Sequence, residues 1–214
     1  MSVIPTATTE SDAPRAQRQA ARRESTRRRL VEAATALFAE SGLHAATSVA
    51  IARRAGVATG TFYLHFPDKH AVFEEIVATT LAELQARQDR ASAARAPGED
   101  DLRVQLEVLV AFTEEHRDLV RVAFERGGEN AAVAHRIHDD VARRVEATLR
   151  RHAGSEPLPF HPGAAAQARA ATLIRVIAWW AEDPARATRE EIVETLHHLA
   201  PSRLARAAAE RPAR

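Results

Sequence analysis

The chain has 214 residues, of which 45% are hydrophobic and 28% charged, and its formal net charge at pH 7 is +1. This composition is typical of a soluble globular protein and excludes a disordered or fibrous chain. The absence of cysteine excludes a disulfide scaffold, a zinc ribbon, an iron–sulfur site and thiol catalysis. The sequence has no run of about 18 apolar residues and no signal peptide, so it predicts a cytoplasmic protein that does not enter a membrane.

The charge is unevenly distributed along the chain. Residues 1–70 carry 10 basic and 6 acidic side chains, a net charge of +4, whereas residues 71–214 carry 20 and 23, a net charge of −3. A basic first segment suggests a polyanionic partner for that segment alone. Arg outnumbers Lys 29 to 1, so a single Arg is a weak indicator and the one lysine, Lys69, is more informative.

The first third of the chain predicts a polar tail and four helices. Residues 1–22 are poor in apolar side chains and are expected to be a disordered tail. From Ser25 onward apolar residues recur at helical spacing until Gly42, and Thr47 or Ser48 can cap a second short helix that ends at Gly56. A third helix is expected over residues 58–65. Pro67 cannot continue it, and Asp68 can cap a long fourth helix.

The rest of the chain repeats the helical pattern. Five further helices are expected, separated by a break at residues 96–99, the Gly127–Gly128 pair, a proline-rich loop at residues 155–163, and Pro184. No alternating strand pattern or internal repeat is present. The predicted fold is therefore all-α with about nine helices, divided into a tail (residues 1–22), a first helical domain (23–70) and a larger second helical domain (71–214).

The strongest local signal lies at residues 48–67, where two short helices flank a turn that contains Gly56. This arrangement matches a helix-turn-helix unit. Ala52 allows the helices to approach, Gly56 can adopt the left-handed conformation that a tight turn needs, and Phe62 is expected in the small core. The polar residues that follow the turn would face outward, where small or hydrogen-bonding side chains suit a DNA major groove.

The segment GLHAATSVAIARRAGVATGTFYLHFPDKHAVF, residues 42–73, resembles the DNA-binding signature of the TetR family of bacterial transcriptional repressors. The resemblance covers roughly residues 25–75, and beyond it only the helical architecture is similar. It implies a homodimer that binds a near-palindromic operator on double-stranded DNA through its first three helices. It also implies that residues 23–70 form the DNA-binding domain and that residues 71–214 form a helical domain that holds a small-molecule effector site and the dimer interface.

The resemblance assigns two groups of DNA-binding residues. Those expected to contact the phosphate backbone are Thr47, Thr61, Tyr63, His65 and Lys69, and those expected near base edges are Ala58, Thr59 and Gly60. The chain departs from the family at Ala58, where members commonly carry a capping hydroxyl, so Thr59 is expected to cap the recognition helix instead.

Some polar and basic side chains of this region also fit a purely structural role. Tyr63 and His65 can simply cover the core with their polar ends in water. The remaining basic residues have two possible roles. They either contact DNA, those in the tail as a flexible arm, or they are charges in contact with solvent alone. These residues are Arg15, Arg18, Arg22, Arg23 and Arg27–Arg29.

The later helices offer weaker predictions. The predicted effector pocket, whose members can equally be ordinary core residues, consists of Leu84, Phe112, His116, Arg121, Phe124 and Trp179. The predicted dimer interface, on the last two helices, consists of Leu173, Ile177, Trp180, Ile192 and Leu196. Because adjacent residues on a helix point about 100° apart, Trp179 and Trp180 are expected in different environments.

Catalysis and metal binding are disfavoured. His135, His138 and Asp139 share one side of a helix, but no further convincing metal ligand accompanies them. His197 and His198 are expected to splay apart. No metal and no cofactor are therefore predicted. Signature motifs of hydrolases, phosphate-binding loops and zinc proteases are absent.

The sequence therefore predicts a ligand-responsive transcriptional regulator, most consistent with a homodimeric repressor that a small apolar or amphipathic molecule releases from DNA. A helical-bundle enzyme, with carboxylates such as Glu114 and Glu115, and a non-specific DNA-packaging protein are the alternatives.

Overall fold

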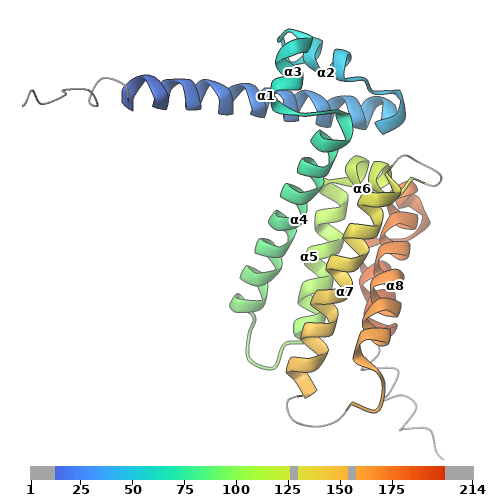
Figure 1. Ribbon diagram of the computed structural model, residues 1–214. Coiled ribbons are helices and arrows are strands. Elements are labelled where there is room, and N and C mark those ends of the chain that lie inside the picture. Colours follow the sequence, from blue (N-terminus) through green and yellow to red (C-terminus); the bar gives the residue numbers. More distant parts are fainter. Residues whose placement is uncertain (1–12, 126–129, 154–157, 201–214) are drawn as a thin grey trace, which may run out of the picture.

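The computed structural model describes residues 13–125, 130–153 and 158–200, and within these ranges the chain contains helices and no strand. A short N-terminal head lies above a longer bundle (Figure 1). The head contains α1 (Ala13–Ala45), α2 (Ser48–Arg54) and α3 (Thr59–His65). The bundle contains α4 (Lys69–Ala94), α5 (Asp101–Glu115), α6 (Arg117–Ala123), α7 (Ala131–Ala153), α8 (Pro162–Glu182) and α9 (Arg189–His198), with the 3₁₀ turn η1 (Pro184–Arg186) before α9. The predicted all-α class is confirmed.

Helix α1 begins at Ala13, ten residues before the predicted domain boundary at residue 23. The segment lacks the apolar periodicity used to locate helices, but alanine, arginine and glutamine are all good helix formers. Residues 15–25 are exposed along their whole circumference. The expected tail is therefore helical from residue 13, and residues 1–12 lie outside the described part of the chain. Near its other end the helix is interrupted at Gly42 (φ 74°, ψ 171°), where a stop was predicted.

Side-chain caps set the beginnings of several helices. Thr47 Oγ1 accepts a hydrogen bond from the Ala50 amide at 3.1 Å, and Asp68 Oδ1 accepts one from the Ala71 amide at 2.9 Å. Both residues were predicted as caps. Thr188 and Glu191 form a complete capping box at the start of α9.

One hydrophobic cluster joins the head to the bundle. In the head it contains Leu30, Phe38 and Phe62, and it continues through Phe73 of α4 to α6 and α7. The rings of Phe38 and Phe73 meet edge to face at 5.6 Å. The bundle residues of this cluster include Val122, Ala123, Val133 and Ile137. The domain boundary predicted at residues 70 and 71 lies in the first turn of α4, a continuous helix.

A second hydrophobic cluster holds α5, α8 and α9 together. Trp180 is its largest member; it is 1% exposed, and its Nε1 donates to the Ala187 carbonyl at 2.8 Å. On the surface beside this cluster, Arg103 of α5 pairs with Glu190 and Glu194 of α9. None of the helices in the described ranges combines the length and the apolar character that a membrane span requires.

Candidate nucleic-acid interface and effector domain

The turn between α2 and α3 has the tight geometry of a helix-turn-helix. Gly56 adopts φ 66°, and the Val57 amide donates to the Ala52 carbonyl at 3.0 Å. Arg29 of α1 reaches the turn and donates to the carbonyls of Ala55 and Gly56. A Cβ added at residue 56 would lie 2.9 Å from Arg29 Nη2, the end of a flexible side chain that can shift, so the positive φ is the main reason for glycine at this position.

Helix α3 presents small and polar residues to solvent. Its N-cap is Ala58, which forms no side-chain cap, and Thr59 is the first helical residue. The expectation that Thr59 caps this helix is therefore wrong, because a side chain inside the first turn cannot accept from the amides that follow an N-cap. No atom lies within 4 Å of a Cβ built at Gly60, so this side of the helix leaves room for another molecule to approach its backbone.

The aromatic and imidazole side chains of α3 combine packing with exposure. Tyr63 is 55% exposed, although its ring contacts buried Phe62 edge to face at 5.3 Å. Partial burial, followed by the positive charges of Arg23 and Arg27, lowers the pKa of the His65 imidazole. The body of the Tyr63 ring therefore covers the core while the remainder faces water, which leaves its hydroxyl compatible with a second, DNA-binding role.

Several predicted phosphate-binding residues already have structural partners. Lys69 Nζ donates to the carbonyls of Leu43 and His44 at 2.9 and 3.1 Å, and thereby ties the end of α1 to the start of α4. Thr47 caps α2 and remains exposed. Their contact with DNA stays a prediction.

Two of the three consecutive arginines on α1 hold the head together. Arg27 pairs with Glu75, donates to the His65 carbonyl at 3.1 Å, and lies over the Phe66 ring at 4.3 Å from its centre. Arg29 supports the turn, whereas Arg28 is exposed and lies 3.6 Å from Glu32. Solvated charge, one of the two predicted roles, therefore describes neither Arg27 nor Arg29.

The predicted effector residues do not form a single group. Phe112 of α5 stacks on His116 with ring centres 4.1 Å apart, and Arg87 of α4 lies 4.9 Å from the centre of the Phe112 ring. His116 Nε2 is buried and has no hydrogen-bond partner among the residues that the structure describes. The other members are spread over the bundle: Leu84 is half-buried on α4, Arg121 is exposed beside Asp118, Phe124 packs on the first cluster, and Trp179 lies on the outer side of α8.

One charged side chain in the bundle escaped the sequence prediction. Arg169 of α8 is half-buried, and burial lowers the pKa of its guanidinium. Within the described ranges no carboxylate forms an ion pair with it. The abundance of arginine in this chain hides such a residue from sequence inspection.

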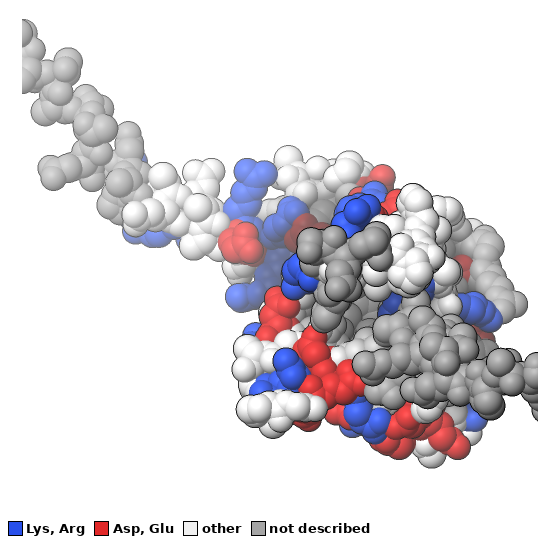
Figure 2. All heavy atoms as spheres, turned by 90° about the horizontal axis from the view of Figure 1, so that it is seen from below, with Lys and Arg blue, Asp and Glu red and all other residues white. Residues whose placement is uncertain are grey.

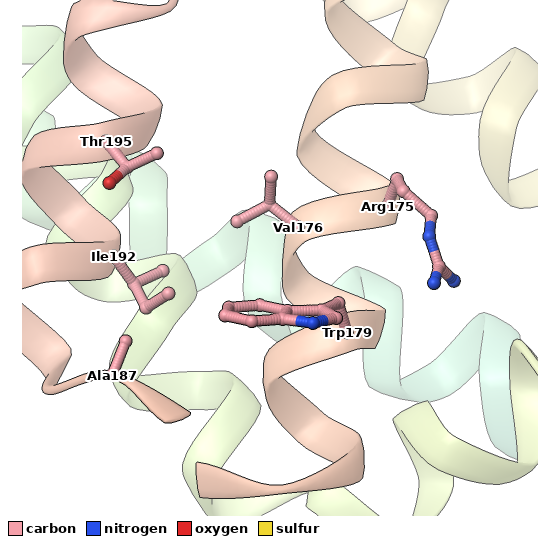
Figure 3. Close-up of a pocket in the computed structure, with 6 residues that line it drawn as sticks. All are labelled: Arg175, Val176, Trp179, Ala187, Ile192 and Thr195. Carbon is pink, nitrogen blue, oxygen red and sulfur yellow. The ribbon is translucent and has the colours of Figure 1, made fainter. Parts of the chain in front are cut away.

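The outer faces of α8 and α9 enclose a shallow depression of about 450 Å³, lined by Arg175, Val176, Trp179, Ala187, Ile192 and Thr195 (Figure 3). The Trp179 ring lies along it toward α9, while Arg175 points away. Trp179 is 38% exposed, and Arg186 stacks on it at 5.3 Å. By contrast, four of the five residues predicted for the dimer interface are buried in this chain and Leu173 is half-buried; the four are Ile177, Trp180, Ile192 and Leu196.

The histidines of interest have protein partners. His135 and His138 contact the Ala131 carbonyl and Gln167, on the helical face where solvation was expected. His197 and His198 do not splay fully apart: with Glu194 they bring three ligand-type atoms within 4.8 Å of one another. Asp100 engages His197 at 2.7 Å and Arg103 engages Glu194, so these side chains already have partners within the protein.

A tight turn, an open recognition helix and a helical bundle joined to them by one core define a helix-turn-helix DNA-binding regulator. Residues 30–76 match the family of bacterial regulatory proteins of the tetR type. The transcriptional regulator AcrR of Shigella flexneri is 30% identical over 151 residues, which cover 64% of this chain and 68% of AcrR. The chain belongs to the TetR family.

Two further similarities agree with this assignment. The chain is 28% identical over 120 residues to the helix-turn-helix regulator YhgD of Bacillus subtilis; the match covers 56% of this chain and only 61% of YhgD. Its fold resembles the crystal structure of Thermus thermophilus FadR, a TetR-family transcriptional repressor in complex with lauroyl-CoA. That comparison has a TM-score of 0.60 at 24% identity and covers 81% of this chain and 92% of FadR. As a member of this family, the chain is a transcriptional regulator.

Proposed function

We propose that this regulator is a cytoplasmic, homodimeric repressor that binds a near-palindromic operator and leaves it when an amphipathic small molecule binds in the bundle. The observation that carries the proposal is the shared hydrophobic cluster, in which Phe62 of the recognition helix and Ile137 of α7 belong to one packed core. Because packed cores transmit displacement, a ligand that moves α6 or α7 also moves the head.

The DNA-binding part of the proposal uses the exposed side of α3 and its flanks. Ala58, Thr59 and Gly60 open the recognition helix, and Thr61, Tyr63 and His65 follow along it. Hydroxyl, phenol and imidazole groups are suitable donors to phosphate oxygens, and the small opening residues allow close approach to base edges. Thr47 and Lys69 stand at the starts of the two neighbouring helices. A dimer would place two such surfaces about 34 Å apart, one turn of DNA.

The dimer part of the proposal uses the outer faces of α8 and α9, with Trp179 in place of Trp180. A tryptophan with a large exposed ring is an unusual surface residue, and tryptophan is enriched among residues that dominate protein interfaces. Leu199, at the end of α9, is 44% exposed and adds apolar surface at the same helix pair. The five residues that the sequence predicted for the dimer interface would instead pack in the core beneath α8 and α9.

The effector part of the proposal rests on the contacts of α4, α5 and α6. His116 offers a buried nitrogen without a partner beside the apolar Phe112 ring, and a buried polar atom of this kind is costly unless another molecule satisfies it. Arg169 lies apart from these residues, on α8, where it is half-buried and would suit the acidic group of a long ligand. Long acyl-CoA thioesters have both characters, and the structurally similar FadR was crystallised with lauroyl-CoA.

Fluorescence anisotropy with labelled duplexes from the region upstream of the protein's own coding sequence tests the proposal. We expect salt-sensitive binding that prefers a near-palindrome over a scrambled duplex of equal composition, and release by lauroyl-CoA but not by CoA or laurate alone. By linkage, operator DNA must weaken lauroyl-CoA binding by the same factor. Equal affinity for all duplexes would instead indicate a non-specific packaging protein.

A conservative variant tests the assigned surface. Tyr63→Phe removes the phenol hydroxyl and keeps the ring contact with Phe62. A hydrogen bond to a charged group contributes about 1.5–3 kcal/mol, so operator affinity should fall by roughly 10- to 150-fold for each of the two half-sites. Thr148→Val, near the C-terminal end of α7, is the control and should bind as the unmodified protein does. Unchanged affinity of Tyr63→Phe would remove this residue from the interface.

A further inference from the structure

The N-terminal part of α1 projects from the head as an isolated helix. Figure 1 shows it extending past α2 and α3, on the side opposite α8. Residues 15–25 are all exposed, so no core explains why this segment is ordered as a helix. Isolated helices of this length are marginal in water, and an element of this kind is best explained by a partner.

The charge of the projecting segment identifies the kind of partner. Residues 13–29 contain seven arginines and a single acidic residue, Glu24, a net charge of +6 in a chain whose total is +1. Figure 2 shows blue side chains gathered where α1 joins the rest of the molecule, whereas red and blue mix around the remaining surface of that view. A surface with this charge is complementary to a polyanion.

The spacing of the arginines fixes the direction in which they point. Arg15, Arg18, Arg22 and Arg29 follow one another at intervals of three, four and seven residues, which places them on one face of a helix. Arg29 on that face contacts the carbonyls of the turn between α2 and α3. The three outer arginines therefore line the same side of α1 as the helix-turn-helix. Arg23, one residue further round, is close enough for its charge to act on His65 at the end of α3.

We infer that the segment of α1 around Arg15, Arg18 and Arg22 is a second DNA-binding element, which contacts the phosphate backbone outside the half-site read by α3. This inference rests on the proposed DNA-binding function and extends it to a longer operator. From Arg15 to Arg29 the helix rises about 21 Å, the length of roughly six base pairs. In a dimer built on α8 and α9 the segment points away from the partner, and hence toward the outer flank of the operator.

The test compares two triple variants of the full-length protein. Arg15→Ala/Arg18→Ala/Arg22→Ala removes the proposed contacts and keeps the helix, because alanine is the best helix former. The matched control, Arg143→Ala/Arg150→Ala/Arg151→Ala, removes the same charge from the exposed side of α7. Circular dichroism establishes that both variants keep the helical content of the unmodified protein.

Affinity is measured between 50 and 200 mM NaCl on two duplexes, the minimal operator and the same operator extended by ten base pairs on each side. Each phosphate contact contributes about 0.9 to the slope of log K against log salt, and a dimer loses three contacts on each side, so the first variant should lose up to roughly 5.4 of that slope. Over this fourfold range of salt, the unmodified protein should then lose up to roughly 2,000-fold more affinity than the variant. The variant should also lose any preference for the extended duplex.

The outcomes separate the inference from the function on which it rests. Equal slopes for the first variant and the unmodified protein, or equal losses in both triple variants, would overturn the inference while operator binding stands. Absence of operator binding by the unmodified protein would overturn the proposed function and the inference together.

Discussion

Substitutions of the two adjacent tryptophans of α8 should separate the effect on folding from the effect on dimerisation. Trp180 is 1% exposed and its indole donates to the Ala187 carbonyl, whereas Trp179 is 38% exposed beside the depression between α8 and α9. Truncation of a buried tryptophan costs about 3–5 kcal/mol, and the lost hydrogen bond about 1 more. Since a domain of this kind is stable by only about 5–15 kcal/mol, Trp180→Ala should remove a large part of the free energy of unfolding.

One alanine variant should change thermal stability and the other should change dimerisation. For a chain of this size each kcal/mol lowers Tm by about 2–4 °C, so Trp180→Ala should lower Tm by roughly 8–24 °C. Trp179→Ala should change the folding of one protomer little. It should weaken the dimer by about 4 kcal/mol, or roughly a thousandfold in Kd, because a twofold interface loses the ring on both sides and each counts about 2 kcal/mol.

Differential scanning calorimetry and sedimentation equilibrium, both at one protein concentration, measure these effects, because the Tm of a dimer depends on concentration. The reasoning would be refuted if Trp179→Ala dimerised like the unmodified protein, or if Trp180→Ala kept its Tm and merely dissociated.

Four further substitutions test individual contacts. Ala58→Ser should raise the free energy of unfolding by about 1 kcal/mol in urea titrations, because it supplies the cap that α3 lacks; no gain would contradict the uncapped start. Gly56→Ala should lower it by about 1–2 kcal/mol in the same titrations, because φ is 66° and the added Cβ would meet Arg29; full stability would show that the turn relaxes. The pKa of His65 is lower in the folded protein, so protonation favours unfolding: stability should be complete above the unfolded pKa near 6.5 and decline below it, and His65→Gln should reduce that decline in thermal scans from about pH 7.5 to 5. Arg169→Met should keep or raise Tm without ligand, because a desolvated charge without a counter-ion opposes folding, and a clear fall in Tm would reveal a stabilising contact of this guanidinium.

Local backbone chemistry accounts for the successful sequence predictions. Thr47 and Asp68 cap their helices and Gly42 and Gly56 have positive φ, because these choices depend on residues within one turn of the chain. The start of α1 was missed for the opposite reason. Its first residues have helix propensity but no apolar stripe, and helices were located in the sequence by apolar stripes.

The candidate sites show where sequence inspection stops. The helical angle between Trp179 and Trp180 predicted two environments, but which face meets α9 depends on how three helices pack, and no spacing reveals that. Likewise Lys69 and Arg27 have the charge of phosphate-binding residues, yet their carbonyl and carboxylate partners lie far away along the chain. Phe112 and His116 are one helical turn apart and their rings stack, while their role in an effector pocket stays a prediction.

The shared core around Phe62 and Phe73 has a consequence for how such a regulator changes over time. Its bundle side is built from Val122, Ala123, Val133 and Ile137, so these positions serve the recognition helix as well as their own helices. A substitution there that improved the fit of a new inducer would also tilt the surface that reads DNA. Substitutions that adapt the protein to new chemical signals should therefore accumulate around His116, away from these four core positions, and leave the four positions nearly unaltered.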